Sequence, residues 1–296
     1  MKKVGVIGLG DMGSGLAKNL INKGFETVGF DLSQKRIEEF KAIGGNPARN
    51  VKSVAQTATT VFLMVMTGDQ AHEVIFGNGG LVENLAKGSS IILTATIKPS
   101  EAKNLGLKLE EFDLHFIDSP VSGGFAGAQS GNLTMMAAGT TEALAVNSDF
   151  MKAVSKTIHV VGNKAGEGQT VKACLQSLIG SIFSATFEAS ALAAKAGISG
   201  EVLFNVFSTS GASSGVSNTA LENIIDRKFE GTGSHIATMH KDLTIVLDMS
   251  KDLGVPLHMA STAMQLFHAG KTKYPGGDNW VVTKVIEEIV GAELHR

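Results

Sequence analysis

The segment GLGDMG, residues 8–13, constrains the fold of this chain more than any other feature. It follows a short apolar run at residues 3–7 and leads into residues 14–23, where apolar side chains recur at helical spacing. This is the pattern of a strand, a glycine turn and a helix. Glycines at this spacing let the turn close, let the backbone approach a phosphate group and let the helix pack on the strand.

Strand-like and helical runs alternate after this start. Strands are expected at residues 27–30, 60–66, 90–93, 115–118, 133–139 and 157–162, and helices at residues 33–42, 69–75 and 99–110. Such alternation predicts an α/β Rossmann-type domain with a doubly wound, mostly parallel sheet.

The pattern changes after residue 162, because strand-like runs stop and helical periods continue to the end. The glycine-rich residues 163–168 mark the expected boundary. We therefore expect a dinucleotide-binding Rossmann domain at residues 1–164 and an all-helical domain at residues 165–296. A long helix, from residue 169 to about residue 195, is expected to join them.

An acidic residue, Asp31, ends the second expected strand, about twenty residues after the glycines, where a carboxylate can accept from both hydroxyls of an adenine ribose. A carboxylate there also repels a 2′-phosphate, so NAD is favoured, while the nearby Lys35 and Arg36 keep NADP open. The predicted cofactor residues of this region are Gly8, Leu9, Gly10, Asp11, Met12, Gly13 and Asp31.

Composition and charge narrow the function classes. The formal net charge is −2 and the basic residues form no cluster, so a nucleic-acid partner is not expected. The one cysteine, Cys174, cannot form an intrachain disulfide, which fits a reducing, cytoplasmic compartment, and it is expected in the core. No apolar segment looks long enough to span a bilayer, so no membrane partner is expected. The histidines lack metal-ligand spacing, and no metal site is predicted.

A lysine, Lys172, stands near the start of an apolar helical run, residues 169–196. A helix this poor in charge is expected to be buried, and a buried ammonium must be paired, deprotonated or functional. Such a lysine can give a proton to a carbonyl oxygen as hydride arrives at carbon, or take it back. The alternative is a lysine that reaches solvent along its own stem. Gln176 shares its helix face and can hold the amine or the reacting oxygen.

Two further motifs carry polar groups. Ser122, Gly123 and Gly124, in DSPVSGG after an expected strand, offer a hydroxyl and approachable N–H groups that suit a substrate carboxylate. A surface turn is the alternative. Lys241, in HKDL at residues 240–243, lies in a helical segment where a solvated Lys-Asp pair is the alternative.

Four motifs together resemble the 3-hydroxyacid dehydrogenase family: GLGDMGSGLAKNL at 8–20, DSPVSGGFAGAQSG at 118–131, GEGQTVK at 166–172 and KDL at 241–243. The resemblance covers nearly the whole chain. It implies a Rossmann domain, a helical second domain on a long interdomain helix, and NAD- or NADP-linked oxidation of a short 3-hydroxy acid. Because family members pair through their helical domains, it also implies a homodimer or homotetramer, with Trp280 packed on the neighbouring subunit.

The same resemblance implies roles for single residues. Lys172 is the catalytic lysine, residues 122–124 receive the substrate carboxylate, and Lys241 approaches the nicotinamide end of the cofactor. Thr96 matches a threonine that touches the cofactor, and Met66 and Thr67 stand where the family commonly has Leu-Pro.

This sequence departs from the family pattern in two places. Leu175 and Gln176 replace a common asparagine pair, and LTAT at residues 93–96 replaces Asp-x-Ser-Thr. Gln176, with the closing segment GGDNWVVTKVIEE, looks most like the L-threonate dehydrogenase branch, so L-threonate or a similar sugar acid is the favoured substrate. 3-Hydroxyisobutyrate dehydrogenase and tartronate semialdehyde (2-hydroxy-3-oxopropionate) reductase are the alternatives.

Other classes remain open as rivals. Decarboxylating 6-phosphogluconate dehydrogenases share the glycine loop and the lysine helix but have much longer chains. A non-catalytic dinucleotide-binding protein of this fold, or an imine reductase, is expected to lack the lysine that this chain keeps at position 172.

Overall fold

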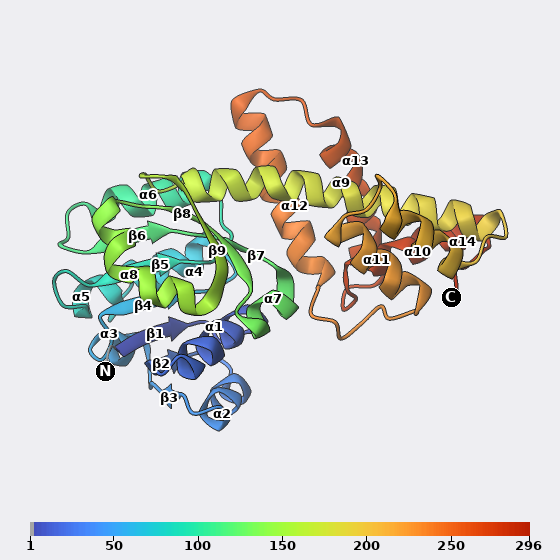
Figure 1. Ribbon diagram of the computed structural model, residues 1–296. Helices are drawn as coiled ribbons and strands as arrows, with labels where there is room; N and C mark the ends of the chain where they lie inside the picture. The colour runs from blue at the N-terminus through green and yellow to red at the C-terminus, as the bar shows by residue number, and fades with distance from the viewer. Residues whose placement is uncertain (1–2) are drawn as a thin grey trace. The chain divides into compact units, whose positions relative to one another are not determined.

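The computed structural model describes residues 3–296 and divides the chain into two compact units. The sheet unit ends at Lys172, and the helical unit runs from Ala173 to Arg296. Each has a hydrophobic core of its own. In Figure 1 the strands of the sheet unit run from blue to green along the chain, and the helical unit continues from yellow to red. Strands and helices alternate as far as β9, and only helices follow it. This order confirms the predicted fold class.

The sheet unit is built on a nine-stranded sheet in the order β3-β2-β1-β4-β5-β6-β8-β7, with β9 paired to β8. The strands are β1 (Lys3–Ile7), β2 (Glu26–Phe30), β3 (Asn46–Pro47), β4 (Thr60–Leu63), β5 (Ser90–Leu93), β6 (His115–Asp118), β7 (Val121–Ser122), β8 (Leu133–Ala138) and β9 (Ser155–Gly162). The pairs β6–β8 and β7–β8 are antiparallel, and the other pairs are parallel. The predicted doubly wound, mostly parallel sheet is therefore confirmed.

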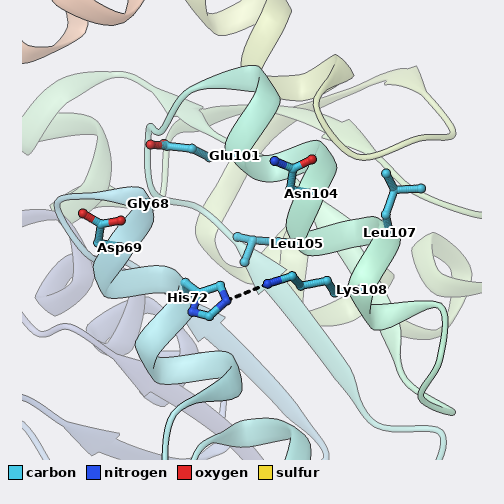
Figure 2. A pocket seen from close by; sticks show the side chains of 8 residues that line it. All are labelled: Gly68, Asp69, His72, Glu101, Asn104, Leu105, Leu107 and Lys108. Carbon is cyan, nitrogen blue, oxygen red and sulfur yellow. Dashed lines mark hydrogen bonds between the residues drawn. The ribbon is translucent and has the colours of Figure 1, made fainter.

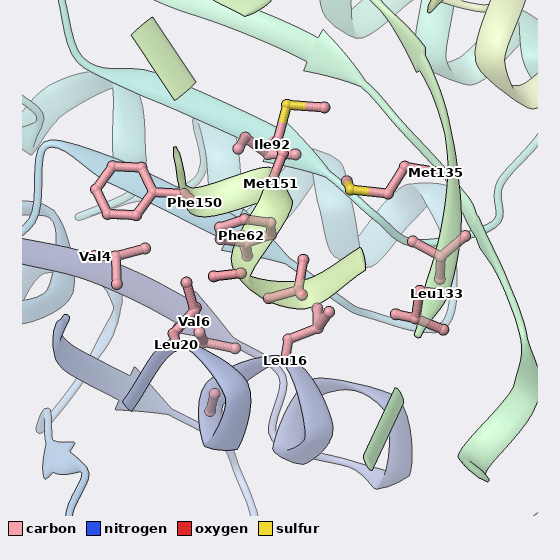
Figure 3. Packing of buried hydrophobic residues seen from close by; sticks show 14 of the residues in the cluster. Val4, Val6, Leu16, Leu20, Phe62, Ile92, Leu133, Met135, Phe150 and Met151 are labelled. Carbon is pink, nitrogen blue, oxygen red and sulfur yellow. The ribbon is translucent and has the colours of Figure 1, made fainter. Parts of the chain in front are cut away.

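Helices cover both faces of this sheet, because successive residues of each central strand are apolar and point to opposite faces. One core packs Val4 and Val6 of β1 and Phe62 of β4 against Leu16 and Leu20 of α1, as Figure 3 shows. A second core packs the alternate strand residues against α3, α4 and α6. The helices of the unit are α1 (Asp11–Asn22), α2 (Gln34–Ala42), α3 (Val51–Ala55), α4 (Gly68–Phe76), α5 (Leu81–Asn84), α6 (Pro99–Leu109), α7 (Gly124–Ser130) and α8 (Thr141–Val154).

The strand order creates a switch point beside β1. The chain moves outward from β1 to β2 and β3, then returns to β4 on the other side of β1. In open α/β sheets, ligands bind outside the carboxyl ends of the strands at such a point. The topology thus places the first loop of the chain, between β1 and α1, at the expected binding edge.

The helical unit begins within α9 (Glu167–Lys195), whose first turns belong to the sheet unit. It continues with α10 (Gly200–Thr209), α11 (Gly215–Ile225), α12 (Ile236–Leu253), α13 (His258–Lys273), the 3₁₀ turn η1 (Asn279–Val281) and α14 (Val282–Val290). Phe183, Phe187 and Phe267 pack together at its centre, with the first two rings stacked 5.9 Å apart between centroids. The all-helical character expected of this half is confirmed.

Two expectations for single side chains are wrong. Trp280 is 3% exposed and its Nε1 donates to the Lys228 carbonyl at 2.6 Å, so it packs inside its own unit instead of on a neighbouring subunit. Cys174 is exposed, not in the core, because it lies on a face of α9 that the unit leaves uncovered.

The expectation that no apolar segment is long enough to cross a bilayer also fails on length and composition. Helix α9 has 29 residues and is apolar enough to pass that test. However, 44% of its most apolar stretch is buried inside the protein, and a core helix passes the same test. The helix is therefore weak evidence for a membrane span.

Candidate active site

Two glycines of the first loop are required by packing. Gly8 has a φ of +88°, and a Cβ there would lie 2.1 Å from the Met64 carbonyl oxygen. A Cβ on Gly13 would lie 1.8 Å from the Gly8 carbonyl oxygen. These contacts bring the start of α1 against the ends of β1 and β4, so any side chain at either position would push the loop apart.

The middle glycine, Gly10, is different. Its φ is −61°, and an added Cβ would meet nothing within 4 Å. Neither backbone strain nor packing inside the unit therefore requires glycine here. Open space directly at the N-terminus of α1 is what a pyrophosphate needs to approach the backbone N–H groups. The loop thus fits a dinucleotide.

Asp31 ends β2 beside this loop. Its Oδ2 accepts from Leu9 N–H at 2.7 Å and its Oδ1 accepts from Ser33 N–H at 2.8 Å, so the carboxylate fixes the loop while staying partly exposed. Arg36 is turned to other partners, since its guanidinium lies 2.6 Å from Asp11 and 3.3 Å from Glu39. Asp31 is therefore a carboxylate at the end of β2 that could accept hydrogen bonds from a ribose.

The other residues of the sheet unit that are expected to bind the cofactor follow neighbouring strands. Met66 is 51% exposed, and its N–H donates to Gln70 Oε1 at 2.9 Å. The Thr67 hydroxyl caps α4, and Thr96 lies in the loop after β5. The expected strand over residues 60–66 ends early, at Leu63, because its pairing with β1 stops where the chain turns at Gly8. Residues that follow β1, β2, β4 and β5 thus share one edge of the sheet.

Lys172 is buried, with 6% exposure, and its Nζ donates to the Val121 carbonyl oxygen at 2.9 Å. Val121 immediately precedes Ser122, so the structure brings the lysine to the segment expected to hold a carboxylate. Gly123 and Gly124 have φ values of +134° and +61°, a turn that side chains rarely allow. Lys172 is therefore held beside this segment within the sheet unit.

The helix that follows this turn packs on the helix of the glycine loop. A Cβ on Gly15 of α1 would lie 2.6 Å from the Ala128 backbone of α7, and Asn19 Nδ2 donates to the Ala128 carbonyl at 2.8 Å. Contact this close fixes the Ser122–Gly124 turn relative to the cofactor loop.

Gln176 and Lys241 lie in the helical unit and share one partner. Gln176 is 7% exposed, and its Nε2 donates to Asp242 Oδ2 at 2.5 Å. The Lys241 ammonium lies 3.1 Å from Asp242 Oδ1. Asp242, which the sequence analysis did not single out as a site residue, therefore orients both; the Lys-Asp pair in HKDL was the signal for it.

Asp118 and Gln169 were not predicted as site residues, although Asp118 begins DSPVSGG and Gln169 lies in GEGQTVK. Asp118 ends β6 with no exposed surface, and its carboxylate accepts from Gly166 N–H at 2.8 Å, Gln169 N–H at 3.2 Å and Gln169 Nε2 at 2.8 Å. Burial raises the pKa of this carboxyl to about 6, while these donors, with the Gly168 N–H, oppose the rise. The first turn of α9 is thus bound to the end of β6.

The sheet unit also has two pockets. One, of about 330 Å³, lies between α4 and α6, where His72 and Lys108 point toward each other at 3.0 Å (Figure 2). The other, of about 680 Å³, follows α6 and the turn before α9. Neither is lined by Lys172, Ser122 or Asp31. Within residues 3–296, no three His, Cys, Asp or Glu side chains are grouped to hold a metal ion.

Comparison with known proteins matches both halves of the chain. Residues 3–162 match the NAD binding domain of 6-phosphogluconate dehydrogenase, and residues 166–286 match the family described as NAD-binding of NADP-dependent 3-hydroxyisobutyrate dehydrogenase. An L-threonate dehydrogenase of Haemophilus influenzae is 34% identical over 97% of this chain and 95% of its own. The mitochondrial 3-hydroxyisobutyrate dehydrogenase of Rattus norvegicus is 31% identical over 89% and 80%.

A crystal structure of 3-hydroxyisobutyrate dehydrogenase from Salmonella typhimurium is also similar, with a TM-score of 0.89 and 30% identity over 96% of this chain and 100% of that one. The chain belongs to the 3-hydroxyacid dehydrogenase family. It is an NAD(P)-dependent oxidoreductase that acts on CH–OH donors.

The two kinds of glycine in the cofactor loop predict different defects. Gly10→Ala should keep the thermal stability of the protein and weaken NADH binding by about tenfold or more, since its methyl group occupies only the space of the ligand. Gly13→Ala should destabilise the fold by about 1–3 kcal/mol through overpacking. Tm and NADH fluorescence titration separate them, with the open Gly211→Ala as control. Unchanged NADH affinity in Gly10→Ala would contradict the assigned cofactor path.

The buried Asp118 carboxyl predicts a pH dependence of stability. The pKa of this carboxyl in the folded protein, about 6, lies above the ordinary value of 3.8. Its contribution to the free energy of unfolding is therefore fully present below pH 3.8 and is lost as the pH rises through 6. A shift of about two units corresponds to about 3 kcal/mol. Carboxyl ¹³C NMR should show a titration near pH 6 that moves higher in Gln169→Leu, which loses a stabilising donor. A carboxyl that titrates near pH 4 would disprove the assignment.

Proposed function

We propose that the chain oxidises the hydroxyl of a short 3-hydroxy acid with Lys172 as general acid and base, and that L-threonate or a similar sugar acid is the substrate. The observation that carries the proposal is the buried Lys172 ammonium, 2.9 Å from the Val121 carbonyl and next to the Ser122–Gly124 turn. A lysine that reached solvent would not be 6% exposed.

The lysine performs the proton half of the reaction. When bound, NAD(P) accepts the hydride in oxidation and returns it in reduction. The Lys172 amine takes the proton of the substrate hydroxyl as the carbonyl forms, and the ammonium returns it to the carbonyl oxygen in the reverse direction. The Val121 carbonyl accepts a hydrogen bond from Nζ and so fixes its direction, while burial keeps bulk water from competing for the proton.

The Ser122–Gly124 turn is proposed to bind the substrate carboxylate. Its hydroxyl and backbone N–H groups are the donors that a carboxylate needs, and positive φ values at Gly123 and Gly124 shape the turn. Because the same segment contacts Lys172 through Val121, a carboxylate bound there places the carbon chain of the acid near the amine.

NAD is the proposed cofactor in preference to NADP. Asp31 would repel a 2′-phosphate, and Arg36, the nearby candidate for binding one, is paired with Asp11 and Glu39. The exposed Lys35 is the feature that keeps NADP as the alternative. Met66, Thr67, Thr96 and Lys241 remain proposed cofactor contacts.

The substrate proposal rests on the helical unit and on the relatives. The Haemophilus influenzae relative carries the name L-threonate dehydrogenase. Gln176, one turn after Lys172 along α9, presents an amide held by Asp242, and an amide suits the extra hydroxyls of a sugar acid. 3-Hydroxyisobutyrate and tartronate semialdehyde are the alternative substrates. A homodimer or homotetramer and a cytoplasmic location remain predictions.

A substrate panel with a lysine variant tests this function. L- and D-threonate, D-glycerate, 3-hydroxyisobutyrate, 3-hydroxypropionate and 6-phosphogluconate are each offered with NAD and with NADP. We expect turnover of a threonate, faster with NAD. Lys172→Ala should lose turnover by about 100- to 10,000-fold, because the proton transfer is lost, while NADH binding is kept.

Lys195→Ala is the matched control for this experiment. Lys195 ends the same helix and its ammonium also donates to a backbone carbonyl, that of Val290 at 2.7 Å, but it is exposed. It should keep the wild-type rate. Near wild-type turnover in Lys172→Ala would rule out the proposed role of the lysine. A preference for 3-hydroxyisobutyrate over the threonates would make that acid the substrate instead of a sugar acid.

A further inference from the structure

We infer that Asp118 and Gln169 are positioning residues for the reaction, which hold Lys172 and the Thr96 loop in one fixed arrangement. The inference rests on the proposed role of Lys172. Neither side chain needs to touch substrate or cofactor to act in this way; both are buried inside the sheet unit, at 0% and 1% exposure.

The Gln169 side chain binds the loop on both sides of Thr96. Its Nε2 donates to the Ala95 carbonyl at 3.0 Å, and its Oε1 accepts from Ile97 N–H at 3.1 Å. The same Nε2 donates to Asp118 Oδ1 at 2.8 Å. One amide therefore connects the loop after β5 to the carboxylate at the end of β6, and it fixes the backbone on both sides of Thr96.

The same carboxylate fixes the helix that carries Lys172. Asp118 Oδ2 accepts from the N–H groups of Gly166 and Gln169 at the start of α9, a position where a negative charge is favoured. Lys172 is three residues further along this helix, and its Nζ returns to Val121, three residues after Asp118. Asp118 is thus connected to Lys172 in two ways: through its hydrogen bonds to the start of α9, and along the chain to Val121, which accepts from Lys172.

Glycines make this approach close. A Cβ on Gly168 would lie 2.6 Å from the Asp118 carbonyl oxygen and 2.7 Å from that of Met136. Gly166 has a φ of +96°, and a Cβ there would lie 2.8 Å from the Pro99 carbonyl oxygen. The first turn of α9 therefore has little freedom to slide along β6, and Lys172 inherits that fixed position.

A buried polar network of this kind is not the most stable way to fill a core. An ionised carboxylate without exposed surface is costly, and apolar residues of similar volume often replace buried polar networks without loss of stability. This network binds both the helix of Lys172 and the Thr96 loop, and so it fixes their positions relative to each other. Catalytic groups need such fixed positions, because they must be held to within fractions of an ångström.

The test compares four variants in single-turnover hydride transfer, NADH affinity and Tm. Gln169→Leu keeps the volume and removes the hydrogen bonds; we expect a fall of roughly 10- to 100-fold in the rate, with weaker NADH binding because the Thr96 loop is released. Asp118→Asn should also lose rate, since its amide would face the Gln169 amide donor to donor. Gln169→Glu should also lose rate, because its carboxylate would face the Asp118 carboxylate. Asp118→Asn/Gln169→Glu restores the donor–acceptor contact between the two side chains, though not the one to Ala95, and should be faster than Asp118→Asn and faster than Gln169→Glu.

Thr170→Val is the matched control, because it removes the hydrogen bond of a partly buried hydroxyl to Gly166 O in the same helical turn without touching Asp118. It should keep the wild-type rate. Where Asp118→Asn yields no folded protein, Gln169→Leu and Gln169→Glu decide the question alone.

The outcomes separate this inference from the proposed function. If the Gln169 variants have the wild-type rate and NADH affinity while Lys172→Ala is inactive, the positioning role is overturned and the proposed role of Lys172 stands. Losses of rate that only parallel the loss of Tm, without rescue in the double variant, would also overturn it. An active Lys172→Ala would instead remove the proposed function itself.

Discussion

The hydrogen bonds between the Asp118 carboxylate and the first turn of α9 are the constraint on which the rest of the sheet unit's site depends. They bind the buried end of β6 to the start of a 29-residue helix. Through them Lys172 is held at Val121, and through Gln169 the loop around Thr96 is held as well. A single buried charge thus connects the groups proposed for proton transfer with the edge of the sheet that is proposed to bind the cofactor.

The cofactor edge itself follows from topology and from three glycines with separate physical roles. The reversal of strand order beside β1 opens the carboxyl edge of the sheet. Gly8 and Gly13 are required by packing, whereas Gly10 leaves open space for a ligand. Because α7 packs directly on α1, the Ser122–Gly124 turn is fixed to this same scaffold. The glycine loop at residues 8–13 and the Ser122–Gly124 turn are therefore parts of one rigid arrangement within the sheet unit.

The sequence predicted those features that short-range pattern determines. The glycine loop, Asp31 and the alternation of strands and helices are local signals, and the structure has them where they were expected. The partners of Asp118 were not predictable in this way, because Gln169 is 51 residues away and only the folded sheet brings them together. The predictions for Trp280 and Cys174 were wrong for a related reason. The helical period shows which face of a helix is apolar, but it does not show which other helix covers that face.

The central claim, that Lys172 transfers the proton, is tested most directly by chemical rescue. Single-turnover hydride transfer is measured in Lys172→Ala with added primary amines of different pKa. The account predicts a rate that rises with amine concentration and follows the basicity of the amine, as expected when the amine replaces a missing general base. A rate indifferent to every amine, in a variant that still binds NADH and the acid, would contradict it.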